Sequence, residues 1–210
     1  MVEAAGIGPG MRVLDLGAGS GNTALLAAGQ GAEVTAVDLT DDLFATCRQR
    51  AAAVEATVTW AAVNPEDLPF GADQFDRVVS AVGGPLAMAS NQRRVAAEMA
   101  RVRRPGGVLA VANWTAGGLV GQAARVIASY LPPPPPGAPS PWAWAAEGSV
   151  KALLDPFGYA VRLTPADGDV QLPFARVLPQ LPRGGVRPDH HGTAAGRRAG
   201  SASGVERRAI

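Results

Sequence analysis

The glycine-rich turn after the first apolar segment constrains this chain most. Residues 11–16 (MRVLDL) predict a buried β-strand, and the run Gly17-Ala-Gly19-Ser-Gly21 follows directly. Residues 22–29, rich in small side chains, then predict a helix. Glycines let the backbone approach a ligand closely, and the first N–H groups of a helix are free to bind one. This order of elements predicts a ligand site at the carboxyl end of the strand.

Strands and helices alternate along the first half of the chain. The further strands that we predict cover residues 32–37, 56–62, 75–81 and 108–113. One predicted helix ends near residue 53 and is capped by Thr40, Asp41 and Asp42; another covers 91–102 and is stopped by Arg-Pro-Gly-Gly at 104–107. Such alternation predicts a parallel sheet with helices on both faces. We therefore expect an α/β fold with a doubly wound, Rossmann-like, mostly parallel sheet.

The alternation loosens after residue 114. Helices are predicted over 119–130 and 147–154, and five prolines at 132–136 predict a stiff spacer between them. Residues 159–163 and 170–174 flank an Asp-Gly-Asp turn, which predicts a C-terminal antiparallel hairpin. We expect three regions in all: an α/β core over 1–117, substrate-side helices and terminal strands over 118–178, and a disordered basic tail over 179–210.

The net charge of +1 over 210 residues conceals an uneven distribution. Residues 1–178 carry 13 basic and 16 acidic side chains, whereas residues 179–210 carry six Arg, two acids and both His, a net charge of +4. A mildly acidic body argues against nucleic acid as a partner. The single Cys, Cys47, excludes an intrachain disulfide and a Cys-rich zinc site, and we expect it to be a small buried side chain.

The uncharged stretch 105–124 contains five Gly and three polar residues, which favours a buried strand running into a loop and helix over a membrane span. No basic and apolar leader opens the sequence, since Glu3 and Gly-Pro turns come first. We therefore expect a cytoplasmic protein that does not bind membranes. The sequence leaves its oligomeric state open.

Five ordered segments resemble the class I S-adenosylmethionine-dependent methyltransferases, specifically their small-molecule branch. These segments are VLDLGAGSGN (13–22), VTAVDLT (34–40), NPEDLPF (64–70), FDRVVSAVG (75–83) and RPGGVLAVANW (104–114). With LLDPFGYAV (153–161), the resemblance covers roughly residues 2–176. It implies a methyltransferase sheet, S-adenosyl-L-methionine as the cofactor and methyl transfer to a small-molecule partner.

The resemblance also implies how the first two strands hold the cofactor. Its methionine portion would lie along the glycine run, namely Gly17, Ala18, Gly19 and Gly21. Asp15 would hold the ammonium group of the methionine directly or through water. Asp38 would accept hydrogen bonds from the ribose hydroxyls, and Leu39 would pack on the adenine.

Two later segments complete the implied site. Asn64, followed by Pro65, stands where many relatives have an Asp that accepts a hydrogen bond from the adenine amino group. The amide oxygen of Asn64 can still accept, though without a charge-assisted bond. Residues from Ser80 to Gly83, including Val82, would line the methyl-transfer channel.

Simpler roles are open for the same residues. The glycines could serve only to make the turn, Asp38 only to cap a helix, and Asn64 only to turn the chain. Trp142 and Trp144 could stack on a planar substrate or pack against the Pro-rich stretch.

No catalytic residue can be assigned from the sequence. Methyl transfer from a sulfonium is an in-line displacement, in which the protein mainly supplies alignment. Residues 1–178 contain no His, so a base would have to be a carboxylate or a Tyr, or the acceptor would ionise by itself. No metal site is expected, because the adjacent His190 and His191 have no third ligand nearby.

Two departures from the family pattern bear on activity. The chain begins almost at its first strand, where relatives carry covering helices, so we expect a shortened N-terminus. Beyond about residue 175, a basic run replaces the relatives' aromatic-Gly-Pro-Thr motif. One interpretation is an out-of-frame product, because GC-rich codons for residues 181–193 read one base later can encode such a motif. The other interpretation is a basic arm that binds nucleic acid.

Three functions are weighed on these grounds. The first is a small-molecule methyltransferase, and the second is a non-catalytic remnant that folds and binds cofactor without turnover. The third is an NAD-dependent oxidoreductase, whose G-x-G-x-x-G pattern would need a glycine where Asn22 stands. The glycine spacing favours the first two.

Overall fold

The sheet is the frame on which the rest of the chain is arranged. The computed structural model describes residues 1–81 and 91–166, and the compact unit Met1–Val161 holds the strands and helices below. The strands are β1 (Arg12–Leu16), β2 (Glu33–Asp38), β3 (Val58–Ala62), β4 (Phe75–Ala81) and β5 (Arg103–Ala112). They lie in the order β3-β2-β1-β4-β5, and each neighbouring pair is parallel. The predicted doubly wound α/β sheet is confirmed.

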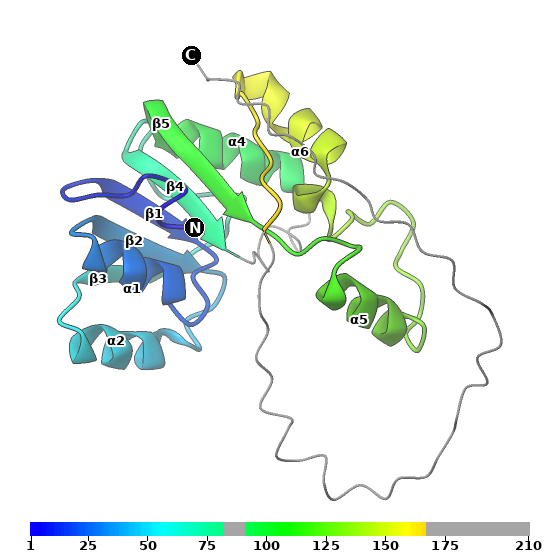
Figure 1. Ribbon diagram of the computed structural model, residues 1–210, viewed down its shortest axis with the longest axis horizontal. Coiled ribbons are helices and arrows are strands. Elements are labelled where there is room, and N and C mark those ends of the chain that lie inside the picture. The colour runs from blue at the N-terminus through cyan, green and yellow to red at the C-terminus, as the bar shows by residue number, and fades with distance from the viewer. Residues whose placement is uncertain (82–90, 167–210) are drawn as a thin grey trace, which may run out of the picture. The chain divides into compact units, whose positions relative to one another are not determined.

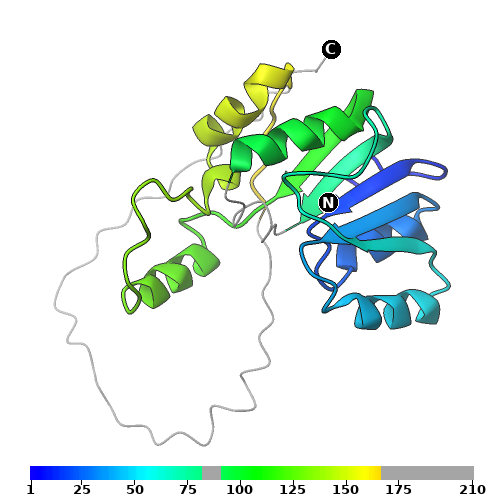
Figure 2. The ribbon, with the colours of Figure 1, turned by 180° about the vertical axis from the view of Figure 1, so that it is seen from behind.

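Helices cover both faces of this sheet. The helices of the described residues are α1 (Asn22–Gly29), α2 (Phe44–Ala53), α4 (Gln92–Val102), α5 (Leu119–Ala128) and α6 (Glu147–Leu154), with short 3-10 turns η1 (Ala143–Ala145) and η2 (Asp155–Phe157). Helix α5 is largely exposed and covers neither face. Seen from the front and from behind, α1 and α4 lie on opposite faces (Figures 1 and 2). No helix within residues 1–81 and 91–166 is long and apolar enough to cross a membrane.

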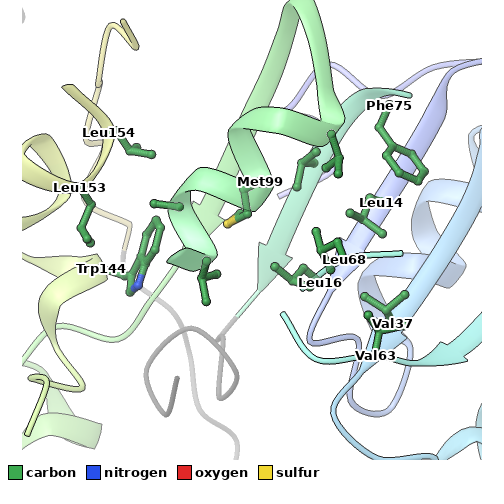
Figure 3. Packing of buried hydrophobic residues seen from close by; sticks show 14 of the residues in the cluster. Leu14, Leu16, Val37, Val63, Leu68, Phe75, Met99, Trp144, Leu153 and Leu154 are labelled. Carbon is green, nitrogen blue, oxygen red and sulfur yellow. The ribbon is translucent and has the colours of Figure 1, made fainter. Parts of the chain in front are cut away.

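The face beneath α4 is packed with large side chains. Met99 of α4 lies between Trp144 of η1 and the strand residue Leu14 (Figure 3), and Val95 of α4 is buried in the same cluster. The buried residues of α4 recur at helical spacing, so one stripe of the helix meets the sheet. We call this layer the α4 face. Its buried members are Leu14, Leu16, Val37, Val63, Leu68, Phe75, Val78, Val95, Ala96, Met99, Val102, Trp144, Val150, Leu153 and Leu154.

The opposite face is packed mainly with alanines, and we call it the α1 face. Ala24 and Ala27 of α1 are completely buried, and Ala36 of β2 is buried in the same cluster. Small side chains on both sides of an interface let a helix approach a sheet closely. The other buried members are Ala5, Ile7, Val13, Ala18, Ala32, Val34 and Val79.

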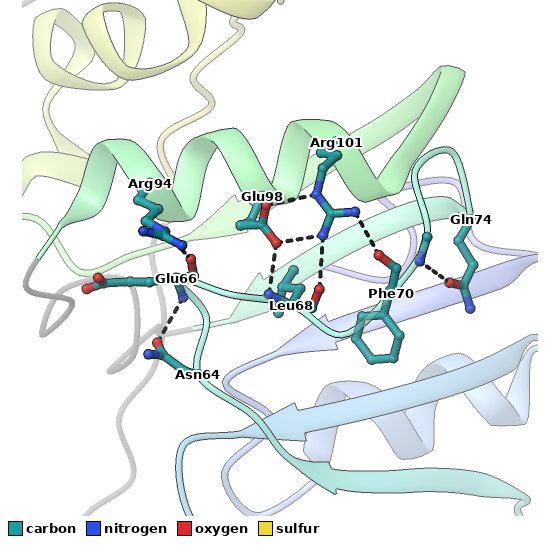
Figure 4. A network of polar contacts seen from close by, with 9 residues as sticks. Asn64, Glu66, Leu68, Phe70, Gln74, Arg94, Glu98 and Arg101 are labelled. Carbon is teal, nitrogen blue, oxygen red and sulfur yellow. Dashed lines mark hydrogen bonds and ion pairs between the residues drawn. The ribbon is translucent and has the colours of Figure 1, made fainter.

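The connection between β3 and β4 contains no helix. Charged side chains fasten it to α4 (Figure 4). Arg101 of α4 donates to the carbonyl oxygens of Phe70 (2.7 Å) and Leu68 (3.0 Å). It also pairs with Glu98 at 2.6 Å, and Glu98 accepts from the Leu68 N–H at 2.8 Å. The hydrogen bond from Arg101 lowers the pKa of Glu98, against the opposing effect of burial. The connection is therefore fastened to α4 at Leu68 and Phe70.

The predicted antiparallel hairpin is not borne out. Its first arm, residues 159–163, forms no strand, and its second arm, 170–174, lies outside the described residues. Tyr159 and Val161 instead pack against the α4 face, and the Tyr159 hydroxyl accepts a hydrogen bond from Arg103 Nε at 2.5 Å. Side-chain packing, rather than backbone pairing, holds this part of the chain.

Two predicted element boundaries are also wrong. Helix α2 begins only at Phe44, with Leu43 at its N-cap position and no side-chain cap, so Thr40, Asp41 and Asp42 do not cap it, and residues 41–43 form a bend and turn instead. The Phe44 N–H donates to the carbonyl oxygen of Asp41 in that turn. The Arg-Pro-Gly-Gly run does end α4 at Val102, but it belongs to β5. The register shifts between Phe75 and Arg77 opposite this run, which marks a bulge that absorbs the proline and glycines.

Candidate functional site

The glycine run makes a tight loop at the carboxyl ends of β1 and β2. Gly17, Gly19 and Gly21 all have positive φ (77°, 52° and 81°), a conformation that favours glycine. The N–H groups of Gly17 and Ala18 both donate to the carbonyl oxygen of Val37, at 2.8 and 2.9 Å. The loop is thus fastened to β2 before α1 begins.

Asp38, the last residue of β2, fastens the next part of the loop. Its Oδ2 accepts from the Gly19 N–H at 2.8 Å, and its Oδ1 accepts from the Leu39 N–H at 2.7 Å. Each carboxylate oxygen can accept more than one hydrogen bond, so Asp38 can still accept from a ligand hydroxyl. The alternative of a simple helix cap does not describe this residue, since its bonds go to the glycine loop and to its own neighbour.

Trp60 and Cys47 support the loop from below. A Cβ built on Gly21 would lie 2.8 Å from the Trp60 ring and 3.4 Å from the Cys47 sulfur, so only glycine fits there. Cys47 is completely buried, as predicted, and its thiol donates to the Gly19 carbonyl oxygen at 3.3 Å. Burial, the largest cause, raises the pKa of this thiol. The thiol is thus a packing group of the loop.

Arg50 of α2 holds the far end of the loop. Its guanidinium donates to the carbonyl oxygen of Ser20 and, at 2.8 Å, to Oδ1 of Asn22. Asn22 is the first residue of α1, so one side chain joins α2, the loop and the start of α1.

Asp15 is the most perturbed acid of the site. Both of its carboxyl oxygens are buried, and neither accepts a well-formed hydrogen bond within the described residues. Burial raises the pKa of Asp15 to about 7; the N–H of Ala24 in the first turn of α1 lowers it, and the charge of Asp38 raises it. The structure therefore keeps a carboxyl group without a partner beside the loop and the start of α1.

The carboxyl end of β3 lies next to Asp38. The Val63 N–H donates to the Asp38 carbonyl oxygen at 2.7 Å, and Asn64 follows with an exposed side chain. Oδ1 of Asn64 accepts from the Glu66 N–H at 2.9 Å, whereas Pro65 between them is buried. Asn64 is thus the exposed polar side chain nearest to Asp38 on this strand end.

The sequence of this site region is similar to that of known proteins. Residues 13–107 match the family model described as a methyltransferase domain. An uncharacterised protein of Mycobacterium tuberculosis is 43% identical over 154 residues, which cover 73% of this chain and 56% of that protein. Residues 13–107 belong to the methyltransferase domain family.

A curated relative and a solved structure are also similar to this chain. A ubiquinone/menaquinone biosynthesis C-methyltransferase of Shewanella pealeana is 35% identical over 119 residues, 54% of this chain and 47% of that protein. A crystal structure of a SAM-dependent methyltransferase from Aquifex aeolicus shares the fold, with a TM-score of 0.55, 20% identity and coverage of 75% of this chain and 76% of that one. The chain spans little more than half of the length of the first curated relatives that it matches.

Most of the residues that the resemblance implied meet at one edge of the methyltransferase sheet. The glycine run, Asp38, Leu39 and Asn64 all lie at or beside the carboxyl ends of β1, β2 and β3. Ser80, at the end of β4, is completely buried, and its hydroxyl donates to the Leu16 carbonyl oxygen at 2.6 Å. Val82 lies outside the described residues. Trp144 packs in the core of the α4 face, only 4% exposed, rather than standing free for a substrate.

Three supports of the loop were missed by the sequence reasoning. Trp60, Cys47 and Arg50 reach the loop from β3 and α2, between 26 and 39 residues along the chain. No pattern in the neighbouring sequence predicts that a distant residue will support a loop through tertiary contact. The signal available was the position of Cys47 and Arg50 three residues apart on one face of a predicted helix.

Proposed function

We propose that this chain binds S-adenosylmethionine at the glycine loop and transfers its methyl group to a small-molecule acceptor. Asp38 carries the proposal, because its carboxylate lies at the end of β2 and fastens the loop while keeping lone pairs free for two adjacent hydroxyls. A ribose offers such a pair of hydroxyls. The family of residues 13–107 supports this cofactor.

The other polar groups of the site fit the same cofactor. The buried Asp15 carboxyl lacks a hydrogen-bond partner and lies beside the loop, where the ammonium group of a methionine would compensate its charge directly or through water. A carboxyl group there also opposes the binding of a pyrophosphate at the start of α1, which a dinucleotide would require. Asp15 therefore favours the methyltransferase proposal over the oxidoreductase alternative.

The cofactor supplies an electrophilic methyl group, and the chain supplies position. Fixing two reactants in line is worth roughly 7–11 kcal/mol of the barrier, so a rigid cradle is sufficient for much of the rate. The cradle here is rigid because Asp38, Cys47 and Arg50 all fasten one loop. Residues 1–178 contain no His, which favours an acceptor that ionises without a strong base. The Shewanella relative, a C-methyltransferase of quinone biosynthesis by name, supports a small-molecule acceptor.

Calorimetric titration with S-adenosylmethionine and S-adenosylhomocysteine tests the proposal. The Asp38→Ala variant should lose at least about tenfold in affinity, because charged hydrogen bonds contribute about 1.5–3 kcal/mol each. Asp41→Ala is the matched control, since Asp41 is an exposed acid three residues along the chain. Thermal denaturation of both variants separates lost binding from lost folding.

Turnover on candidate acceptors then distinguishes the alternatives. Methyl transfer supports the proposal, and binding without turnover on any acceptor supports the non-catalytic remnant. A folded chain that binds neither cofactor form overturns the assignment of the site.

A further inference from the structure

A cavity of about 490 Å³ lies between α1 and α2. The two helices lie side by side (Figures 1 and 2), and the lining of the cavity runs from Asn22, the first residue of α1, to Gly29, the last. Its volume is within the range of about 300–1,000 Å³ that is usual for small-molecule sites. None of the described residues assigned above to the cofactor lines this cavity, so it lies outside the cofactor site.

Apolar side chains line most of the cavity. Leu25 and Leu26 contribute from α1, and Val54 and Ala56 contribute from the end of α2 and the residues that follow it. Leu26 and Val54 are both large apolar side chains that are exposed to solvent. A ligand that covers them removes apolar surface from water, which favours binding. We therefore expect the body of the ligand to be apolar.

The cavity also contains the guanidinium of Arg50, a residue of α2. This group donates to two neutral oxygens, the Ser20 carbonyl and Oδ1 of Asn22, and no acid of the described residues forms an ion pair with it. A guanidinium has five N–H groups, so three remain for a ligand. A carboxylate accepts from two N–H groups of one arginine, and such charged hydrogen bonds are about twice as strong as neutral ones. The Arg50 end of the cavity therefore fits a carboxylate.

Two further polar residues of the lining determine where that carboxylate lies. Glu55 follows Val54 directly after α2, and its negative charge repels an anion. The Asn22 amide accepts from Arg50 through its oxygen, and its NH2 group forms no hydrogen bond within the described part of the chain. That NH2 group is a second donor for an anion beside Arg50. The carboxylate of a ligand is thus attracted to Arg50 and Asn22 and repelled by Glu55.

The length of the cavity matches a single alkyl chain. An extended chain of about ten carbons spans about 12 Å, which is the length of a helix of eight residues such as α1. The lining follows α1 from its first residue to its last, so a chain of this length lies along the whole helix.

We propose that the cavity between α1 and α2 binds a free amphipathic monocarboxylate, with its carboxylate on Arg50 and its alkyl chain against Leu26 and Val54. Arg50 keeps its two bonds to the glycine loop and to Asn22, and donates its remaining N–H groups to the ligand. The carboxylate and the cofactor therefore bind at the same time, each at its own site.

Titration calorimetry of the full chain with decanoate, below the concentration at which it forms micelles, tests this proposal. We expect one decanoate to bind per chain, and decylammonium, which has the same length and the opposite charge, to bind at least about tenfold more weakly. Arg50→Met should abolish this preference for the anion. The absence of saturable binding, or equal affinities of the unmodified chain for the two compounds, overturns the proposal.

Leu26→Ser and Leu119→Ser are a matched pair of variants that locate the site. Both leucines are 64% exposed and both belong to short helices, but only Leu26 lines the cavity. Leu26→Ser should weaken decanoate binding by about fivefold or more, because the alkyl chain loses an apolar contact. Leu119→Ser should leave the affinity unchanged, and thermal denaturation checks that both variants fold. Equal effects of the two substitutions would overturn the location of the site.

Binding of S-adenosylhomocysteine distinguishes this site from that of the cofactor. Saturation with S-adenosylhomocysteine should change the affinity for decanoate by less than about threefold, whereas displacement of decanoate would place it in the cofactor site and overturn the proposal. A folded chain that binds S-adenosylhomocysteine and not decanoate retains the proposed function and loses this second site. A folded chain that binds only decanoate retains the second site and loses the cofactor assignment.

Sedimentation at increasing protein concentration tests the other occupant that an apolar cavity could have, a second copy of the chain. The unmodified chain should not associate through the cavity. A dimer that Leu26→Ser dissociates and Leu119→Ser does not would assign the cavity to self-association and overturn the proposal.

Discussion

The two faces of the sheet are built from side chains of different size. On the α4 face, Met99, Trp144 and Phe75 fill a deep layer between the sheet and its helices. On the α1 face, Ala24 and Ala36 are completely buried, and most of the buried side chains are alanines. Large side chains bury more apolar surface and hence contribute more stability, at about 25 cal/mol per Å². Small ones instead let α1, which begins directly after the glycine loop, pack closely on the sheet.

The largest effect is expected when a side chain of the α4 face is shortened. Met99 is completely buried, so Met99→Ala should lower the free energy of unfolding by about 2–5 kcal/mol. Val126→Ala on α5 should change it little, because Val126 is 62% exposed. Urea denaturation of the two variants measures the difference. Equal effects would mean that the α4 face does not carry the stability.

The buried carboxyl of the site should make stability depend on pH. Its pKa is raised from 3.8 to about 7 in the folded chain, so between these values the folded state binds the extra proton. Stability from Asp15 is therefore complete below about pH 4 and is lost as the pH rises to about 7. At about 1.4 kcal/mol per pH unit, the loss is at most about 4 kcal/mol.

Asp15→Asn removes this dependence. Relative to the unmodified chain, the variant should gain stability steadily from pH 4 to pH 8, as followed by melting temperature in buffers of constant ionic strength. A difference between the two proteins that is the same at every pH would show that Asp15 does not titrate in that window.

An added methyl group should lower the free energy of unfolding less at Gly19 than at Gly21 of the glycine loop. Gly21→Ala meets both a positive φ of 81° and a contact of 2.8 Å with Trp60, and should destabilise the chain by about 2–3 kcal/mol. Gly19→Ala meets the positive φ alone, with no atom within 4 Å of its Cβ, and should cost about 1–2 kcal/mol. Denaturation curves compare the two; a larger cost at Gly19 would contradict the close packing of the loop on Trp60.

The smallest effect is expected where α4 holds the connection between β3 and β4. Glu98→Gln should destabilise the chain by about 1 kcal/mol at pH 7, because it weakens a charged hydrogen bond to Arg101. The folded pKa of Glu98 is lowered, so its contribution is present above its ordinary value of 4.5 and is lost as the pH falls below it. The variant and the unmodified chain should therefore converge in acid, and with rising pH Glu98→Gln should become the less stable of its pair, whereas Asp15→Asn should become the more stable of its own.

The sequence predicts the elements where local signals agree. Helices α1 and α6 and strand β4 have the predicted bounds, because their periodicity ends at glycines or polar turns. The start of α2 was missed, since Thr40, Asp41 and Asp42 have the composition of a cap while the backbone uses them as a turn. The start of β5 was missed because Pro and Gly usually interrupt strands, and here a bulge accommodates them.

The site was predictable to the extent that its residues follow strand ends. The glycine loop, Asp38 and Asn64 all do so, and the parallel sheet brings such ends to one edge. The bond from Glu66 to Asn64, which decides what the amide presents, depends on where α4 holds the connection. Contacts of that kind join residues about 30 positions apart and leave no pattern in the sequence.

The bridge from Arg50 has a consequence for hydrogen exchange. Because one guanidinium joins α2 to the Ser20 carbonyl and the Asn22 side chain, opening of α2 releases this end of the loop, while the N–H groups of residues 17–19 keep their bonds to β2. The amide protons of residues 20–22 and those of α2 should then exchange at a common rate, as one cooperative unit separate from the slower amides beneath α4. Arg50→Met should divide that unit, and the loop amides alone should exchange faster. The mobility of this end of the loop would thus be set by α2, which also contacts the loop through Cys47.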